Sequence, residues 1–165
     1  MSSRLDGIAI VVVTVSDRSA AGQRPDSTGP ILAEAFRSAG AEVVGTVVPD
    51  EADEVTRAIE AAIASGARAV VTTGGTGIGP RDITPEATAK LLAHALPGIP
   101  ELLRQRDAAT NPLVALSRGL AGVTARPAPA IVINLPGSPT GVASAIEVLP
   151  ALIAHAVAQL DGGDH

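Results

Sequence analysis

Residues 69–79 read AVVTTGGTGIG, an apolar, β-branched run that leads into a loop with four glycines. The run Ala69–Thr73 has the continuous apolar character of a strand that is buried on both faces of a sheet. Glycines directly after such a strand can adopt positive φ and let backbone N–H groups approach an anion closely. The stretch therefore predicts a parallel α/β sheet with an anion-binding loop at Gly74–Gly79. A tight turn with a purely structural role is the alternative.

Two strand–helix units precede this stretch. The predicted strands are Ile8–Val15 (IAIVVVTV) and Glu42–Val48 (EVVGTVV). Each is followed by a helix pattern, with Thr28 as the cap of the first helix and Gly66 at the end of the second. Consecutive β-α units predict parallel strands joined by right-handed crossovers.

The second half of the chain is expected to add two strands and three helices. The predicted helices are Thr84 to about Ala95, Glu101–Ala108 and about Thr140–Leu160, and the predicted strands are Leu120–Ala125 and Ala130–Asn134. Pro150 should kink or divide the last helix. The whole pattern predicts a single-domain α/β protein over residues 1–165, with a mostly parallel sheet, helices on both its faces and a frayed tail at residues 161–165.

Polar residues follow each of the first three predicted strands. These are Ser16–Arg18, Asp50 and the glycine loop Gly74–Gly79. Ligands of parallel α/β sheets bind beyond the carboxyl ends of the strands. We therefore expect these three segments to converge in space, although tens of residues separate them in the sequence.

Composition excludes several classes of function. The 165 residues contain no cysteine, so a disulfide framework, a thiolate zinc site and a nucleophilic thiol are excluded. The net charge of −5 and the single aromatic residue, Phe36, argue against a surface that binds nucleic acid. No apolar run reaches the length of a membrane span, and the first seven residues lack a signal-peptide pattern. The expected protein is soluble and cytoplasmic.

Two aspartates are candidates for the chemistry. Asp82 follows the glycine loop, and a bound phosphate would repel it unless a cation lay between them. Mg²⁺ is typically held by one or two carboxylates together with phosphate oxygens, which makes Asp50 the natural second acid. The alternatives are a helix cap for Asp50 and a turn residue for Asp82. The three histidines lack metal-ligand spacing, and no Ser/His/Asp arrangement is evident.

Three further segments are candidate contacts for an anion. Ser117-Arg118 offers a hydroxyl and a guanidinium suited to phosphate, unless Arg118 is only a solvated surface residue. The turn Asn134–Pro139 (NLPGSP) follows a predicted strand and can line the same cleft or serve as a connector. Asp26–Gly29 precedes the first long helix, whose amides can face an anion or simply be capped.

Six motifs resemble the molybdenum cofactor biosynthesis family of MogA and MoaB proteins and the G domain of gephyrin. They are VTVSDR (13–18), DSTG (26–29), VPDE (48–51), TGGTGIGPRDITPEA (73–87), LSRGLAG (116–122) and NLPGSP (134–139). This resemblance implies the fold of that family, a homotrimer and adenylylation of molybdopterin. In that reaction ATP and molybdopterin give adenylyl-molybdopterin and pyrophosphate with Mg²⁺.

The resemblance also implies roles for individual residues. Asp50 and Asp82 are expected to be the two essential acids and to hold Mg²⁺. It implies substrate and nucleotide contacts at Thr73, Gly74, Gly75, Thr76, Gly77, Ser117, Asn134, Pro136, Gly137 and Ser138. The position of Ser16 and Asp17 after a strand and the charge of Arg118 add these three residues to the expected contacts. The chain departs from the family at Ile99, where an aromatic residue is common. A contact with the protein that inserts molybdate is a further expectation.

Two other functions remain open from the sequence. One is a catalytically silent, MoaB-like subunit that binds molybdopterin or acts as a scaffold. The other is an unrelated phosphosugar or nucleotide enzyme on a doubly wound sheet. The choice between the molybdenum and tungsten pathways also stays open.

Overall fold

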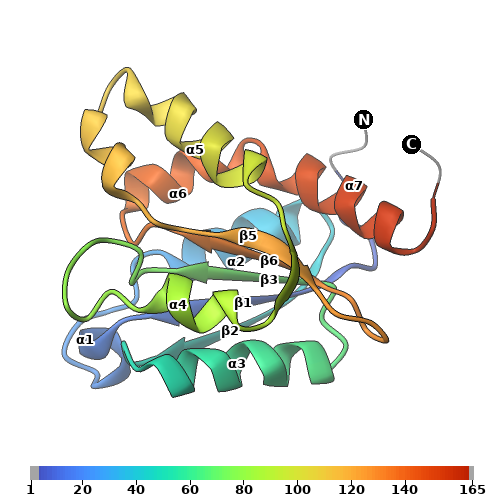
Figure 1. Ribbon diagram of the computed structural model, residues 1–165, viewed down its shortest axis with the longest axis horizontal. Helices are drawn as coiled ribbons and strands as arrows, with labels where there is room; N and C mark the ends of the chain where they lie inside the picture. The colour runs from blue at the N-terminus through green and yellow to red at the C-terminus, as the bar shows by residue number, and fades with distance from the viewer. Residues whose placement is uncertain (1–3, 164–165) are drawn as a thin grey trace.

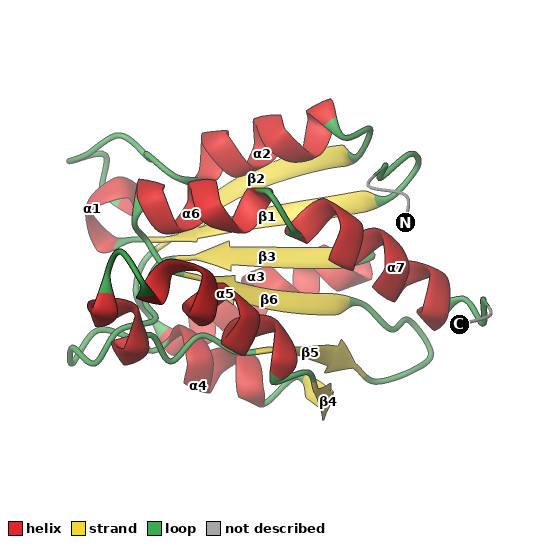
Figure 2. Cartoon of the chain, turned by 90° about the horizontal axis from the view of Figure 1, so that it is seen from above, coloured by secondary structure: helices red, strands yellow, loops and turns green. Residues whose placement is uncertain are grey.

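The computed structural model describes residues 4–163, which form one six-stranded sheet flanked by helices. The strands are β1 (Ala9–Val15), β2 (Glu42–Val48), β3 (Ala69–Thr73), β4 (Leu92–Ala95), β5 (Ala121–Thr124) and β6 (Ile131–Leu135). Their order across the sheet is β2-β1-β3-β6-β5-β4, as Figure 2 shows. The pairs β1/β2, β1/β3 and β3/β6 are parallel, whereas β5 runs antiparallel to both of its neighbours. The mostly parallel α/β sheet predicted from the sequence is confirmed.

Helices cover both faces of this sheet (Figure 1). They are α1 (Asp17–Ala20), α2 (Gly29–Ser38), α3 (Ala52–Ala64), α4 (Thr84–Ala89), α5 (Gly98–Ala108), α6 (Pro139–Ile146) and α7 (Leu149–Leu160), with a 3₁₀ helix at Pro112–Leu116. One buried core lies between the sheet and α2, α6 and α7, and a second lies between the sheet and α3 and α4.

The two cores follow from the alternation of side chains along the strands. Val71 of β3 and Ile133 of β6 face the first core, whereas Val70 and Val132 face the second. All four side chains are at most 1% exposed, as expected for central strands that are covered on both faces. A rigid, doubly covered centre therefore fixes where the loops after β1, β3 and β6 begin.

The helix predicted from Thr84 to about Ala95 is wrong beyond its first turn and a half. The helix ends at Ala89, and Leu92–Ala95 instead forms β4, which pairs with β5. Backbone pairing with a neighbouring strand outweighs the local helix pattern. His94, placed on a helix by the sequence, therefore lies exposed on an edge strand. The predicted start of the helix at Thr84 agrees with the structure, in which Ile83 is the N-cap.

The last predicted helix is divided, as expected from Pro150. The chain bends by 56° between α6 and α7, and Pro150 lies in the first turn of α7. Within residues 4–163, this bent pair satisfies the length and composition of a membrane span, whereas no single helix does so. At the end of α7, Asp161 pairs with Arg68 at 2.7 Å, and residues 164–165 of the predicted tail lie outside the described residues.

Candidate functional site

Gly74 lies where the loops after β1, β3 and β6 meet. Its φ of +101° is favourable only for glycine, and its N–H donates to the Leu135 carbonyl at 3.1 Å. A Cβ atom at this position would lie 2.3 Å from the Val15 carbonyl oxygen. A Cβ atom at Gly137 would lie 3.2 Å from Gly74 Cα. The first glycine of the loop is therefore required for three chain segments to cross closely.

Asp17 and Asp50 connect the ends of β1 and β2 through two reciprocal hydrogen bonds. The Asp17 N–H donates to Asp50 Oδ2 at 2.8 Å, and the Asp50 N–H donates to Asp17 Oδ1 at 2.9 Å. Arg81, just beyond the glycine loop, donates from Nε and Nη2 to the Asp17 carboxylate at 3.1 and 3.0 Å, and from Nη2 to Glu51 at 2.9 Å. The predicted convergence of the three strand-end segments is confirmed.

The carboxyl group of Asp50 lies in a negative and partly desolvated environment. Burial raises its pKa, and the nearby charges of Asp17 and Asp82 add to the increase. By contrast, hydrogen bonds from Arg81 and from the Asp50 N–H lower the pKa of Asp17. Asp50 does not cap a helix, because α3 begins at Ala52 with Glu51 as its N-cap.

Asp82 contacts the end of the glycine loop. Its Oδ2 accepts a hydrogen bond from the Gly79 N–H at 2.8 Å. A Cβ atom at Gly77 would lie 2.8 Å from the same oxygen, and one at Gly75 would lie 3.2 Å from Asp50 Oδ1. Both predicted acids therefore lie close to the loop, and its glycines allow both carboxylates to approach its backbone.

Arg118, a predicted phosphate contact, holds the glycine loop through three groups of the protein. Its Nε donates to the Gly77 carbonyl and its Nη2 to the Asp82 carbonyl, both at 2.7 Å, and its Nη1 pairs with Glu86. Its backbone N–H donates to the Thr76 carbonyl at 2.8 Å. The guanidinium is occupied on three sides by groups of the protein itself, so Arg118 fixes the loop rather than facing the cavity.

Thr73 and Asn134 are also turned inward. Thr73 Oγ1 donates to the Pro136 carbonyl at 2.8 Å. Asn134 Nδ2 donates to the hydroxyls of Thr72 and Thr88 at 2.9 Å each, and its Oδ1 accepts from the Leu120 N–H. Both residues are almost fully buried. Their side chains therefore connect β3 and β6 to neighbouring segments of the protein.

Two of the predicted serines cap helices. Ser16 Oγ accepts a hydrogen bond from the Ser19 N–H and caps α1, and Ser138 Oγ accepts one from the Gly141 N–H and caps α6. Ser117 instead lies in the wall of a cavity.

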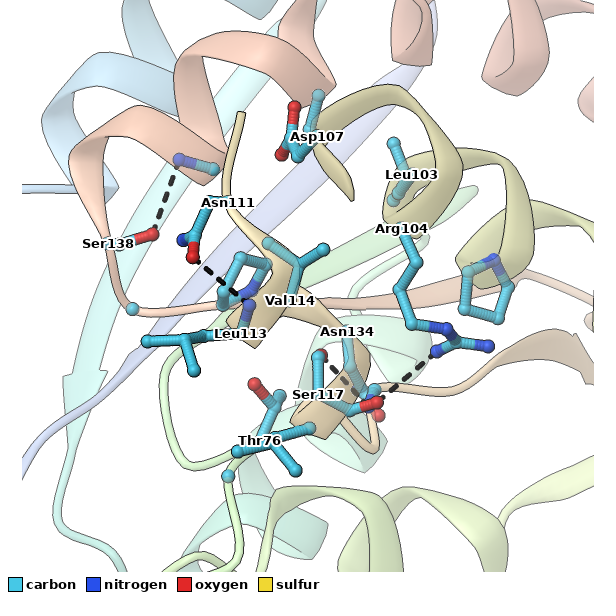
Figure 3. A pocket seen from close by; sticks show the side chains of 18 of the residues that line it. Thr76, Leu103, Arg104, Asp107, Asn111, Leu113, Val114, Ser117, Asn134 and Ser138 are labelled. Carbon is cyan, nitrogen blue, oxygen red and sulfur yellow. Dashed lines mark hydrogen bonds between the residues drawn. The ribbon is translucent and has the colours of Figure 1, made fainter. Parts of the chain in front are cut away.

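This cavity opens beside the glycine loop, with a volume of about 760 Å³ (Figure 3). Of the predicted site residues, those that line it are Gly75, Thr76, Gly77, Asp82, Ser117, Asn134, Pro136, Gly137 and Ser138. Those that do not line it are Ser16, Asp17, Asp50, Thr73, Gly74 and Arg118. Of the two acids close to the glycine loop, only Asp82 belongs to the cavity wall.

The rest of the cavity wall was not predicted from the sequence. It consists of residues from α5 and the 3₁₀ helix, among them Leu103, Arg104, Asp107, Leu113 and Val114. No glycine motif marks this segment, and the short apolar stretch Pro112–Leu116 could have indicated it. Ile99, the departure from the family, packs against the larger core and is outside the cavity wall, so its effect is on packing.

The donor atoms near the loop fit Mg²⁺ bound through phosphate. Asp50 and Asp82 each have one carboxylate oxygen engaged by a backbone N–H, which leaves the other oxygen for a cation. Within residues 4–163 no group of three or more His, Cys, Asp or Glu side chains can hold a metal ion. A site with two carboxylates and substrate oxygens suits Mg²⁺ rather than an all-protein metal cage.

Comparison with known proteins gives one consistent family. A family model described as "Probable molybdopterin binding domain" matches residues 11–155. The chain is 42% identical over 162 residues to the molybdenum cofactor biosynthesis bifunctional protein of Synechococcus elongatus, covering 98% of this chain and 50% of that protein. This chain therefore spans about half the length of that bifunctional relative.

Two relatives are similar over nearly their whole length. The molybdopterin adenylyltransferase of Pyrococcus furiosus is 38% identical over 146 residues, which cover 87% of this chain and 86% of that protein. The crystal structure of the tungsten cofactor synthesizing protein MoaB from the same organism superimposes with a TM-score of 0.87 at 35% identity, covering 93% of this chain and 96% of that one.

Proposed function

The chain belongs to the molybdopterin-binding domain family of molybdenum cofactor biosynthesis proteins, and from this membership we propose that it is a molybdopterin adenylyltransferase. The reaction joins a phosphate oxygen of molybdopterin to the α-phosphorus of ATP. The bond from that phosphorus to the bridging oxygen of the β-phosphate breaks, and pyrophosphate leaves. Relatives that bear this name support the proposal, the one from Pyrococcus furiosus among them.

The observation that carries the proposal is that two carboxylates lie close to the backbone of one glycine loop. Asp50 and Asp82 both lie within reach of the loop backbone, and the loop also forms part of a cavity of about 760 Å³. The chain has no cysteine. A transfer between two phosphates requires positioning and charge compensation rather than a protein nucleophile, which this arrangement supplies.

Within this proposal each wall of the cavity has a separate task. The glycine loop offers backbone N–H groups to phosphate oxygens, and Arg118 keeps the loop in one conformation. The apolar side chains of Leu103, Leu113 and Val114 offer a surface for the flat ring of a substrate. The wall formed by α5 limits the access of water to the reacting groups.

Asp50 and Asp82 would hold Mg²⁺ when substrate is bound. The ion would supply positive charge to offset the charge on the phosphate oxygens. Burial is the main cause of the raised pKa of Asp50, and the charges of Asp17 and Asp82 add to it. Those neighbouring negative charges would favour a divalent cation at this position.

The test is incubation of the protein with ATP, Mg²⁺ and molybdopterin, followed by measurement of pyrophosphate and of adenylyl-molybdopterin. Adenylyl transfer supports the proposal. Molybdopterin binding without pyrophosphate release would instead favour the silent, MoaB-like binding subunit. Binding of neither substrate would point to a different phosphate-binding enzyme.

We further propose a cytoplasmic homotrimer that contacts the protein that inserts molybdate. Exposed apolar side chains on the edge strand β2 support self-association: Val44 is 64% exposed and Val47 is 38% exposed. Sedimentation at micromolar concentration tests the assembly, and a monomer there would contradict it.

A further inference from the structure

Arg104 is the one positively charged side chain among the described residues that line the cavity. It projects from α5 toward Ser117, whereas Asp107, one turn further along the helix, points away from it (Figure 3). Its Nη1 donates to the Ser117 carbonyl at 3.3 Å. Among the described residues this long hydrogen bond is the only one that the guanidinium makes, so its other N–H donors have no protein partner.

Other arginines around the site differ from Arg104 in their partners. Arg81 pairs with Asp17 and Glu51, Arg118 pairs with Glu86, and Arg106 pairs with Glu147 outside the cavity. Within residues 4–163 no carboxylate oxygen forms a salt bridge with Arg104. A half-buried guanidinium without a counter-charge carries an uncompensated desolvation cost. A bound anion would supply the missing counter-charge.

The geometry points to a second anion contact in the cavity wall, in addition to the glycine loop. We propose that Arg104 binds a phosphate group of a substrate through its planar donor fork. The glycine loop and Arg104 would then both hold negatively charged groups in a cavity that the apolar side chains of Leu103 and Val114 also line. No residue of α5 figured among the expected contacts from sequence.

Which phosphate Arg104 binds rests on the proposed function, whereas the anion site itself does not. The chemistry is that of a phosphate monoester or an oligophosphate. Under the proposed function the two sources are the phosphate of molybdopterin and the phosphates of ATP.

The experiment compares Arg104→Gln with the matched variant Arg106→Gln on the same helix. Calorimetry gives the dissociation constants of inorganic pyrophosphate, ATP and molybdopterin for both variants and the wild type. Loss of a charge-assisted contact should weaken binding by about ten- to a hundredfold for Arg104→Gln. Arg106→Gln should bind all three probes as the wild type does.

The separate probes identify the source of the phosphate. Weaker binding of molybdopterin alone assigns Arg104 to the pterin phosphate, and weaker binding of ATP and pyrophosphate assigns it to the nucleotide. Arg104→Lys should recover part of the affinity, because it retains the charge but not the fork. Arg104→Lys also tests the anion site if thermal unfolding shows that Arg104→Gln does not fold.

Two results would overturn the anion site. One is unchanged affinity of Arg104→Gln for all three probes, and the other is equal weakening by Arg106→Gln. If the wild type binds pyrophosphate through Arg104 but transfers no adenylyl group, the proposed function fails while the anion site stands.

Discussion

Asp17 and Asp50 each accept a hydrogen bond from the other's backbone N–H, at 2.9 and 2.8 Å. The two residues are 33 positions apart in the sequence and lie at the ends of neighbouring parallel strands. This reciprocal pair fixes Asp50 beside the glycine loop at the expense of placing two carboxylates close together. Arg81 offsets the charge of Asp17, whereas Asp50 keeps a raised pKa.

We predict that Asp50→Asn abolishes adenylyl transfer but stabilises the fold near pH 7. The pKa of Asp50 in the folded chain lies above its ordinary value of 3.8. The folded state therefore binds this proton more tightly than the unfolded state, and the free energy of unfolding falls as pH rises through that interval. Asparagine removes this penalty and still offers an oxygen to the Asp17 N–H.

The measurement is thermal unfolding of wild type and Asp50→Asn near pH 7 and below pH 3.8. The stability gain should be present near pH 7 and should disappear at the lower pH, where Asp50 is protonated in both states. A gain of equal size at both pH values would contradict the electrostatic origin.

Asp82→Asn should reduce adenylyl transfer by on the order of 10²–10³-fold while leaving the fold intact. Asparagine can still accept the hydrogen bond from the Gly79 N–H, so the loop is retained and only the charge is lost. Pyrophosphate release measures the rate, and Asp53→Asn on the exposed surface of α3 is the control. Near-normal turnover of Asp82→Asn would refute the role assigned to this acid.

Gly74→Ala should destabilise the protein by about 2–4 kcal/mol, since a Cβ atom meets the Val15 carbonyl and the backbone has positive φ. Gly45→Ala is the matched control, because a Cβ atom there has no neighbour within 4 Å. Urea unfolding should show a large loss for the first variant and little change for the second. Equal free energies of unfolding for the two variants would contradict the close approach of Gly74 to the Val15 carbonyl.

Arg118→Lys and Arg118→Ala should both lower the rate of adenylyl transfer, by on the order of 10²-fold. A lysine cannot reach the carbonyls of Gly77 and Asp82 and the carboxylate of Glu86 together, so the loop loses its fixed position. Hydrogen exchange of residues 74–82 should become faster in both variants. The control is Arg57→Ala, which removes a surface ion pair. A wild-type rate for Arg118→Lys would contradict the role of Arg118 in holding the loop.

Much of the fold could be predicted because the strands carry their own signal. The β-branched runs of β1 and β3 are continuous, and each is buried on both faces of the sheet. Parallel order follows from the intervening helices, and it brings the carboxyl ends together without any further information. The convergence of Asp17, Asp50 and the glycine loop was therefore accessible from spacing alone.

The predicted helix failed where a long-range partner decides the outcome. Leu92–Ala95 is compatible with a helix locally and becomes a strand because β5 lies beside it. Thr73 and Arg118 have the chemistry of ligand contacts, yet their donors bind Pro136, Gly77 and other groups of the protein. A local sequence pattern does not show which acceptor a side-chain hydrogen-bond donor will bind in the folded protein.

The sequence by itself determined the doubly covered sheet, the glycine loop and the two aspartates at its border, because strand periodicity and glycine content act over a few neighbouring residues. Only the tertiary structure decided which polar side chains face the cavity and which are used internally. It also brought Arg104 into the same cavity as the loop, since that placement depends on how α5 packs over a sheet formed by distant segments. Local propensities fix elements, whereas packing fixes the direction in which their side chains point.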